Sequence, residues 1–255
     1  MIIYKSEDEI KIMKRAGELV SNVLLKLENT IKPGITTEFL DKIAEEMIVS
    51  HNGKPAFKGY LGRISKVAFP GTICASINEE VVHGIPGKRI LKDGDLVSID
   101  VGARLDGFFG DGARSFIVGN AGRKVQKIIK ATWDALNAAI DKCIAGNRLG
   151  DISHTIESIA AGNGYSVVVD FVGHGIGRNM HEDPQVLNYG PAHQGTLLKK
   201  GIVLAIEPML NEGESDVEVL KDTWTVVTKD RKLSCHFEDT VAITSEGSII
   251  LTSLN

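Results

Sequence analysis

Four carboxylates and one imidazole, far apart in the sequence, are the side chains best suited to chemistry: Asp100, Asp111, His174, Glu207 and Glu238. Asp100 ends the mostly apolar run 96–100, and Glu238 follows Phe237 in the strand-like segment 235–241. An ionised acid in such surroundings is costly unless a positive group meets it. We therefore interpret the five positions as a dinuclear metal site.

The first two acids lie on the arms of a predicted β-hairpin. An Asp-Gly pair at 106–107, between two alternating runs, is typical of a two-residue hairpin loop. With that loop Asp111 lies opposite Gly102, so Asp100 and Asp111 are diagonal neighbours on one sheet face, about 7–8 Å apart at the backbone. A β-bulge in this glycine-rich hairpin would change the parity.

Two acids that converge on one sheet face repel each other. One of them is expected to keep its proton unless a cation lies between them. A pair of divalent ions about 3.5–4 Å apart would remove the conflict and hold a hydroxide ready for attack. The alternative is that both acids are solvated on an open sheet face. The other three positions favour the metal site.

Several other kinds of site do not fit the histidine-containing segments. The segment 173–177 around His174 lacks the G-x-G-x-x-G spacing of a dinucleotide-binding fold, and its plain alternative is a glycine-rich turn. The segment that begins at His181 has Gln185 where the H-E-x-x-H zinc pattern needs a second histidine. A G-x-S-x-G nucleophile motif is also absent from the sequence.

Four separated motifs resemble those of the methionine aminopeptidases, specifically the bacterial-type (type I) enzymes. They are Gly173-His174-Gly175-Ile176-Gly177, His181-Glu182-Asp183-Pro184, Ala205-Ile206-Glu207-Pro208-Met209 and His236-Phe237-Glu238-Asp239-Thr240. Residues 76–86 and 98–102 resemble the same family in the same order, so the resemblance runs nearly from end to end. Several motifs in family order are far more specific than any one of them.

The resemblance implies an α+β pita-bread fold, in which two pseudo-symmetric helix-sheet halves surround a central dinuclear metal site. It implies that the five residues named above bind two divalent metal ions, with Asp111 and Glu238 bridging them. Four carboxylates balance two dications in charge, and oxygen ligands with a single imidazole suit cobalt, manganese, iron or zinc. The sequence does not determine which of these metals is bound.

The implied activity is hydrolysis of the first peptide bond, which removes the initiator methionine from nascent proteins and peptides. A water molecule acidified by the two ions attacks the scissile carbonyl. The resemblance places Glu207 as the general base, His181 against the carbonyl oxygen as an oxyanion-stabilising donor, and His83 near the scissile nitrogen. The alternative for each histidine is a structural residue, and the motif context favours the functional role.

By the same resemblance, the methionine side chain lies in a pocket of aromatic and sulfur-containing residues: Phe57, Tyr60, Phe69, Cys74, Phe171, Met180 and Trp224. Such groups suit an unbranched, polarisable thioether, whereas without the resemblance they would be assigned to the core. Two departures from the family pattern bear on the site. The stretch 61–69 is several residues longer than expected, and Asp239 stands where histidine is common, next to a metal ligand.

Helical periodicity predicts two pairs of helices that position these residues. A capping box at Ser6 begins the first helix, and Thr37 caps a second that ends near residues 51–53. Apolar residues at 125–144 and 152–159 predict the second pair, with a break at 146–147. Each pair precedes a strand-rich stretch, of which residues 70–117 are the first.

A repeat is suggested by a constant shift in numbering, which aligns Ile31, Phe39 and Ile43 with Ile144, Ile152 and Ile156. The alternative is chance register between amphipathic helices, and the family resemblance favours the repeat. Low-complexity linkers are absent from the sequence, so we expect a single domain over residues 1–255, with pseudo-repeats at about 1–117 and 121–255.

The composition, 43% hydrophobic and 24% charged over 255 residues, is that of an ordinary soluble globular protein. A net charge of −4 and a pI near 6.0 give no overall basic field, so stable nucleic-acid binding is not expected. The cysteines at 74, 143 and 235 lack C-x-x-C spacing, which fits free thiols in a reducing compartment. With no signal-peptide or membrane-span pattern in the sequence, we expect a cytoplasmic location.

The expected partner is the N-terminal methionine of nascent polypeptides, together with a transient ribosome contact. We expect a monomer and no membrane association. Two alternatives remain open. A proline-directed relative such as a prolidase or aminopeptidase P usually carries an extra N-terminal domain, for which this chain has no room. A metal-free binding module of the same fold loses metal ligands, whereas all five positions are filled here.

Overall fold

The computed structural model describes residues 1–62 and 65–253. Within these ranges the helices are α1 (Glu7–Glu28), α2 (Thr37–Ser50), α3 (Arg123–Ile140) and α4 (Leu149–Gly162). The strands are β1 (Lys54–Pro55), β2 (Ile73–Ile77), β3 (Glu80–Val82), β4 (Leu96–Leu105), β5 (Phe108–Ile117), β6 (Ser166–Val167), β7 (Gly173–Gly175), β8 (Glu182–Val186), β9 (Val203–Ile206), β10 (Met209–Asn211), β11 (Val217–Val219), β12 (Val226–Thr228), β13 (Ser234–His236), β14 (Glu238–Ile243) and β15 (Ser248–Ile250). Both predicted helix pairs and the strand-rich stretch 70–117 are confirmed.

The first helix begins where the sequence predicts. Glu9 N donates to Ser6 Oγ (3.2 Å) and Ser6 N donates to the Glu9 carboxylate (2.9 Å), which completes the capping box. The cap of α2 is one residue earlier than predicted. Thr36, not Thr37, has the extended backbone of a cap, and its Oγ1 accepts a hydrogen bond from Phe39 N (3.3 Å).

The third helix is shorter than its apolar pattern predicts. It ends at Ile140, and Ile144 lies outside it with 42% of its surface exposed. The chain turns at this point, where Cys143 N donates to Ile140 O (2.9 Å) and the cysteine side chain is buried. The apolar residue at 144 therefore follows the helical spacing without belonging to the helix.

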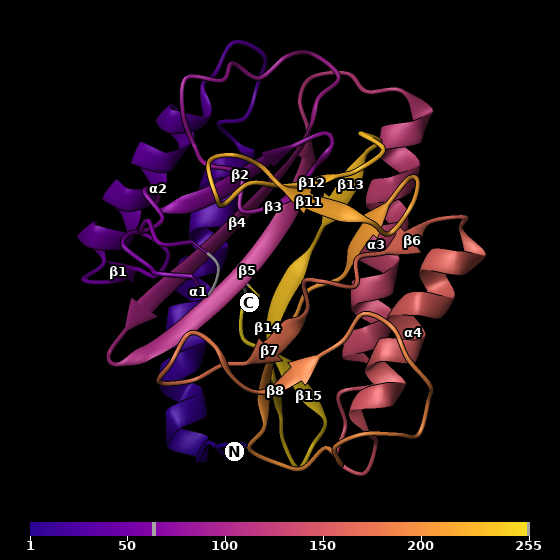
Figure 1. The fold of residues 1–255 in the computed structure, drawn as a ribbon. Coiled ribbons are helices and arrows are strands. Elements are labelled where there is room, and N and C mark those ends of the chain that lie inside the picture. The colour runs from indigo at the N-terminus through magenta and orange to yellow at the C-terminus, as the bar shows by residue number, and fades with distance from the viewer. Residues whose placement is uncertain (63–64, 254–255) are drawn as a thin grey trace.

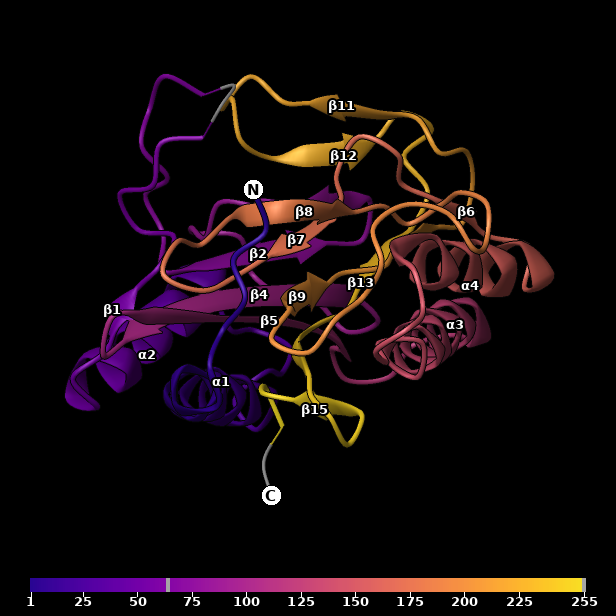
Figure 2. The same ribbon diagram turned by 90° about the horizontal axis from the view of Figure 1, so that it is seen from below.

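One antiparallel sheet crosses the molecule in the order β1-β4-β5-β14-β9-β7-β8, with β2 paired to β4 and β15 to β14. Helices α1 and α2 lie at one side of the molecule and α3 and α4 at the other, with the strands between them (Figure 1). The β11–β12 hairpin lies across the sheet from α1 (Figure 2). The pairing of β5 with β14 joins strands from the two halves of the chain.

Each half has its own apolar core. Val20, Leu40 and Ile99 belong to a buried cluster beneath α1 and α2. Leu136 and Leu204 belong to a second cluster beneath α3 and α4. Burial of such side chains contributes roughly 1.5–3 kcal/mol each, so each helix pair is stabilised mainly by its own part of the sheet.

The predicted hairpin is confirmed in register. Leu105 pairs with Phe108, and the pairing continues without a shift to Leu96 and Ile117. The two loop residues at 106 and 107 have φ angles of 49° and 89°, the left-handed values that a tight two-residue turn requires. The hairpin therefore lacks a β-bulge, and the predicted parity holds.

The helix pairs repeat, but in a register one position away from the predicted one. Helices α2 and α4 have the same length, so their ends align when Thr37 is matched with Leu149. Gly34 N and Gly146 N, which match in this register, donate likewise to the O atoms of Leu91 (2.9 Å) and Leu198 (3.0 Å).

The corrected register matches buried side chains with each other. It places Leu40 with Ile152, both of which are fully buried. The predicted register instead matched Ile152 with Phe39, whose side chain is 47% exposed. The prediction was wrong because it aligned apolar residue types rather than buried faces.

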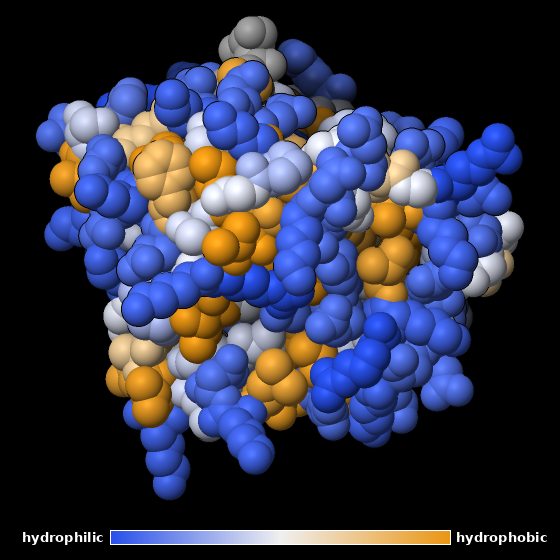
Figure 3. All heavy atoms as spheres, turned by 90° about the horizontal axis from the view of Figure 1, so that it is seen from above, coloured by the Kyte–Doolittle hydropathy of each residue, from blue (hydrophilic) through white to orange (hydrophobic). Residues whose placement is uncertain are grey.

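Apolar side chains on the surface are scattered. The face seen in Figure 3 is mostly hydrophilic, with separate apolar patches between hydrophilic residues. That face therefore offers small apolar patches rather than one extended apolar surface. Among the helices of residues 1–62 and 65–253, none combines the length and the apolar composition needed to span a bilayer.

Candidate metal centre and substrate cavity

Pairing on both sides of β5 brings three acids onto one sheet face. Ala113 of β5 pairs with Asp100 of β4 on one side and with Glu238 of β14 on the other. Asp111 lies two positions from Ala113 and therefore points to the same face. The predicted proximity of Asp100 and Asp111 is confirmed, and Glu238 joins them from the second half of the chain.

His174 and Glu207 reach the same place from the second half. His174 of β7 pairs with Ala205 of β9, and Glu207 follows two positions after Ala205. His174 Nε2 lies 3.8 Å from Glu207 Oε1 and 3.9 Å from Asp111 Oδ2. Single ligand atoms of Asp111, His174 and Glu238 all lie within 4.8 Å of one another. The structure thus brings the five predicted ligand positions together.

Burial determines the protonation of this cluster. Desolvation raises the pKa of Asp100 to about 7. It also raises the pKa values of Asp111, Glu207 and Glu238 well above their usual range, and neighbouring carboxylates raise them further. Desolvation lowers the pKa of His174 to about 3, so its imidazole is neutral and able to bind a metal. Without cations the cluster would therefore retain protons.

Three buried carboxylate oxygens of the cluster lack a hydrogen-bond partner among the described residues: Asp100 Oδ1, Asp111 Oδ1 and Glu238 Oε1. Acceptors are rarely left in this state, because an unsatisfied buried polar group costs about 1–3 kcal/mol, and more when charged. Divalent cations would satisfy the three oxygens and use the neutral ring of His174. The donor set therefore fits hard or borderline metal ions.

Hydroxyl groups join the strands of the two halves beside the cluster. Thr240 Oγ1 donates to Asp111 O (2.8 Å) and accepts from Asp111 N (3.1 Å). Ser115 Oγ donates to His236 O (2.7 Å) and accepts from His236 N (3.2 Å). Each hydroxyl links β5 of the first half to β13 or β14 of the second, so the acids from both halves are held in register.

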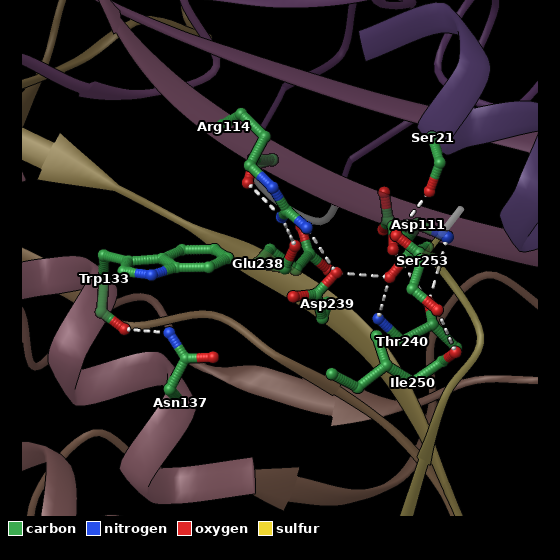
Figure 4. Close-up of polar contacts among 12 residues, drawn as sticks. Ser21, Asp111, Arg114, Trp133, Asn137, Glu238, Asp239, Thr240, Ile250 and Ser253 are labelled. Atoms are coloured by element: carbon green, nitrogen blue, oxygen red, sulfur yellow. Dashed lines mark hydrogen bonds and ion pairs between the residues drawn. The ribbon is translucent and has the colours of Figure 1, made fainter. Parts of the chain in front are cut away.

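Asp239, which departs from the family pattern, is paired with Arg114 (Figure 4). Arg114 Nη2 lies 2.7 Å from Asp239 Oδ1, and Arg114 Nη1 donates to Glu238 O (2.6 Å). Thr252 Oγ1 donates to the same aspartate oxygen (2.5 Å), and the guanidinium lies over the ring of Trp133. The additional negative charge is therefore neutralised, and the same arginine holds the backbone of Glu238.

A cavity of about 1120 Å³ opens onto the acid cluster. All five cluster residues line it, and so do His83 and His181. The rings of His181 and His174 are 4.4 Å apart between centroids, and Tyr60 Oη lies 3.1 Å from His181 Nδ1. His181 is thus adjacent to the cluster, in the wall of the same cavity.

His83 lies in another part of the cavity wall. Its backbone has φ 60°, a left-handed value that is uncommon for a residue other than glycine. Its ring meets Phe171 and Trp224 edge to face, with centroids 5.4 and 6.1 Å apart. Desolvation lowers the pKa of His83 to about 4, so the imidazole is neutral.

Most of the predicted methionine-pocket residues line the same cavity: Phe57, Tyr60, Phe69, Cys74, Phe171 and Trp224. Phe69, Cys74 and Trp224 form a buried apolar cluster with Phe57 packed against it. Met180 is also buried but is not among the lining residues. A Cβ at Gly102 would meet both Met180 Cε and the ring of Phe57, so Met180 lies beside Phe57 on the sheet face that bears the acids.

The longer stretch 61–69 lies against Trp224, although its residues 63 and 64 are outside the described part of the chain. Trp224 Nε1 donates to Val67 O (2.9 Å). Ser65 Oγ lies 2.8 Å from Thr223 Oγ1, and both Gly62 and Ser65 line the cavity. The described part of the longer stretch therefore contributes to the cavity wall.

Sequence reasoning missed His236 as a member of this neighbourhood. Its Nε2 lies 3.9 Å from Glu207 Oε2, and the residue is 2% exposed. A signal was present, because His236 is two positions before Glu238 in a strand-like segment. Asn188 was also missed, and its Nδ2 donates to Glu207 O (3.2 Å). No local pattern in the sequence singled out this asparagine.

Comparison with known proteins identifies the family of this chain. Residues 11–245 match metallopeptidase family M24. A methionine aminopeptidase of Clostridium perfringens is 50% identical over 252 residues, 99% of either chain. The crystal structure of methionine aminopeptidase from Rickettsia prowazekii has a TM-score of 0.95 and 42% identity, over 99% of this chain and 100% of that chain.

A prolidase from Pyrococcus furiosus shares the fold, with a TM-score of 0.79, but it is 24% identical and this chain covers 66% of it. These similarities confirm the expected α+β pita-bread fold. The chain therefore belongs to metallopeptidase family M24 and, within it, to the methionine aminopeptidases of the bacterial type.

Proposed function

We propose that this chain is a metal-dependent aminopeptidase that releases the N-terminal methionine of nascent proteins and peptides. One observation carries the proposal. Buried acids with unmet acceptor atoms meet a neutral histidine in the wall of a cavity that also contains His83 and His181. Similarity to methionine aminopeptidases along the whole chain supports the same substrate.

The proposed cofactors are two divalent metal ions, held by Asp100, Asp111, His174, Glu207 and Glu238. The four carboxylates would balance the charge of two dications. Cobalt, manganese, iron and zinc all suit this donor set. When bound, such ions lower the pKa of a water molecule and polarise the scissile carbonyl. Metal content per chain after reconstitution tests the number of ions.

Three side chains have proposed roles in the reaction. Glu207, which lines the cavity, takes the proton of the attacking water and later passes it to the leaving amine. His181 donates a hydrogen bond to the oxygen of the scissile carbonyl as negative charge develops there. His83, held between Phe171 and Trp224, lies against the scissile nitrogen.

The substrate is held at both ends of its first residue. The proposed methionine pocket comprises Phe57, Tyr60, Phe69, Cys74, Phe171 and Trp224, with Met180 beside Phe57. Aromatic rings and sulfur suit the thioether of methionine. A free α-amine next to Asp100 would limit cleavage to the first peptide bond. Cys74 pairs directly with Asp100 in β2 and β4, so the two ends of this subsite are neighbours.

Two peptides distinguish the proposed activity from its alternatives. The metal-reconstituted protein is incubated with Met-Ala-Ser and with an Ala-Pro peptide, and its metal content is measured in parallel. We expect release of methionine from Met-Ala-Ser and no cleavage of the Ala-Pro peptide. Preference for the Ala-Pro peptide would indicate a prolidase-like enzyme. Absence of both turnover and bound metal would indicate a binding module.

We also propose that residues 1–255 form a single domain, with pseudo-repeats at about 1–117 and 121–255, which acts as a monomer in the cytoplasm. The pairing of β5 with β14 across the halves supports one domain. The three cysteines are free, as is usual in a reducing compartment. Besides its peptide substrates, the only partner in the proposal is a transient ribosome contact. Light scattering on the purified protein tests the monomer.

A further inference from the structure

His236 is buried directly behind the wall of the substrate cavity. The residue is 2% exposed, and it does not belong to the residues that line the cavity. Its backbone is fixed on both sides by Ser115, whose hydroxyl accepts from His236 N and donates to His236 O. Pairing of His236 with Met209 fixes it from the other neighbouring strand. The ring therefore has little freedom to leave its place.

The imidazole has a ring nitrogen that is unpaired among the described residues. His236 Nε2 is buried and has no hydrogen-bond partner there. It lies 3.9 Å from Glu207 Oε2, while Glu207 Oε1 lies 3.8 Å from His174 Nε2. The Glu207 carboxylate thus lies between two imidazoles, one for each of its oxygens.

A histidine with a purely structural role would be expected to satisfy both ring nitrogens within the fold, because an unpaired buried nitrogen is costly. Here the fold fixes the backbone of His236 on two sides and leaves Nε2 facing one acid. A neutral imidazole has one N–H group to donate, and the acid that Nε2 faces is Glu207, with Oε2 at 3.9 Å. His236 Nε2 is therefore placed to donate a hydrogen bond to Glu207.

We propose that His236 is a positioning residue for Glu207, with His236 Nε2–H donating a hydrogen bond to Glu207 Oε2 when the metal ions are bound. This inference rests on the proposed role of Glu207 as metal ligand and base. The hydrogen bond fixes the rotation of the carboxylate, so that His236 holds Oε2 while Oε1 faces His174 and the other ligands. Such outer contacts to ligands commonly change metal affinity about 10- to 100-fold.

A pair of variants with similar side-chain length separates the hydrogen bond from packing. His236→Gln keeps an N–H donor, and His236→Met fills similar space without one. The full-length protein is stripped of metal and titrated with Mn²⁺ by calorimetry. We expect His236→Met to bind Mn²⁺ about tenfold or more weakly, and His236→Gln to stay within about threefold of wild type. His154→Leu, on the exposed surface of α4, is the control for loss of an imidazole.

Equal Mn²⁺ affinity of His236→Met and wild type would overturn the inference. So would equal weakening in His236→Met and His236→Gln, since packing alone would then explain the loss. If His236→Met does not fold, as judged by circular dichroism, His236→Asn replaces it because its amide is too short to reach Glu207. The metal titration is independent of peptide cleavage. A wild-type protein that binds Mn²⁺ but does not release methionine would therefore refute the proposed function and leave this inference testable.

Discussion

The two halves of the molecule share a frame, which is a helix pair (α1 and α2, or α3 and α4) packed on part of the sheet. They contribute to the acid cluster in different ways. The first half supplies Asp100 and Asp111 from one hairpin with unbroken pairing. The second half supplies His174, Glu207 and Glu238 from β7, the end of β9 and β14, and the pairing of β7 with β8 shifts beside His174. One half places its acids through a local turn, and the other through contacts between distant strands.

This difference teaches that the repeated frame and the chemistry are specified separately. Equivalent hydrogen bonds at Gly34 and Gly146 begin the loops before α2 and α4, yet neither helix carries a cluster residue. The cluster residues lie on or next to strands of one sheet, which the pairing of β5 with β14 continues from one half into the other. Changes in the second-half cluster residues should therefore have the largest effect, which is on turnover. Changes at the border between the halves should mainly lower stability. Changes in the frame should have the smallest effect.

The largest effect is expected for Glu207→Ala. This variant loses the proposed base and a metal ligand together, so we expect kcat/KM for Met-Ala-Ser to fall roughly 10⁴-fold or more. Steady-state kinetics on the reconstituted protein measures it. Glu212→Ala, which removes an acid paired with Lys124 on the surface, should leave kcat/KM within about threefold of wild type. Activity of Glu207→Ala near that of the control would refute the role of Glu207.

His181 and His83 allow a second comparison, because they come from different halves and line the same cavity. We expect His181→Ala to lower kcat about 10²- to 10³-fold with little change in KM, since an oxyanion donor acts mainly in the transition state. His83→Ala should have a smaller effect on kcat, roughly tenfold to a hundredfold. A change in His181→Ala confined to KM would contradict the oxyanion role.

The same contrast explains how much could be predicted from the sequence. It was predictable that Asp100 and Asp111 share one sheet face. A two-residue turn fixes the pairing register of a hairpin, and side chains alternate between faces with a period of two. The meeting of His174, Glu207 and Glu238 depends on β7–β9–β14 pairing, which leaves no local pattern, so it came from family resemblance. Distant packing also explains the errors. The repeat register was wrong because spacing alone did not reveal which side of α2 is buried.

At the border between the halves, Arg114→Met should lower the free energy of unfolding by about 3 kcal/mol, because it leaves the buried Asp239 carboxylate without its cation. Urea unfolding of the metal-free protein measures this loss. The double variant Arg114→Met with Asp239→Asn should recover most of it. Arg178→Met, which removes an exposed partner of Glu9, is the matched control and should cost less than about 1 kcal/mol. Equal losses for both single arginine variants would contradict a buried pair.

A pH effect separates the acids from the histidines of the metal-free cluster. Asp100, with its folded-state pKa raised to about 7, favours folding at low pH and loses that contribution as pH rises through 7. His174, with its pKa lowered to about 3, disfavours folding only as pH falls below its unfolded value of about 6.5. From pH 6.5 to 8 each carboxyl proton retained in the folded state lowers the unfolding free energy by up to about 2 kcal/mol. Each buried histidine that loses its proton in the unfolded state raises it by only about 0.4 kcal/mol, so the net fall should be about 1–2 kcal/mol.

Urea unfolding with a chelator at both pH values measures this change. Asp100→Asn removes one of the acids that titrate in this range and should reduce the dependence. Added Mn²⁺ should reverse it, because metal binding displaces protons and strengthens as pH rises. A metal-free protein whose stability rises between pH 6.5 and 8 would show that the acids do not retain protons in the folded state.

The smallest effect is expected in the frame itself, where the two halves differ at one helix cap. Thr36 caps α2 through its hydroxyl, whereas the equivalent Arg148 makes no side-chain cap to α4. Thr36→Ala should therefore cost about 1 kcal/mol of unfolding free energy, and Arg148→Ala less than about 0.5 kcal/mol. Neither change should alter kcat/KM for Met-Ala-Ser, because both caps are remote in sequence from the cluster strands. Equal costs at the two caps would mean that the repeated loops, rather than the threonine hydroxyl, determine where α2 and α4 begin.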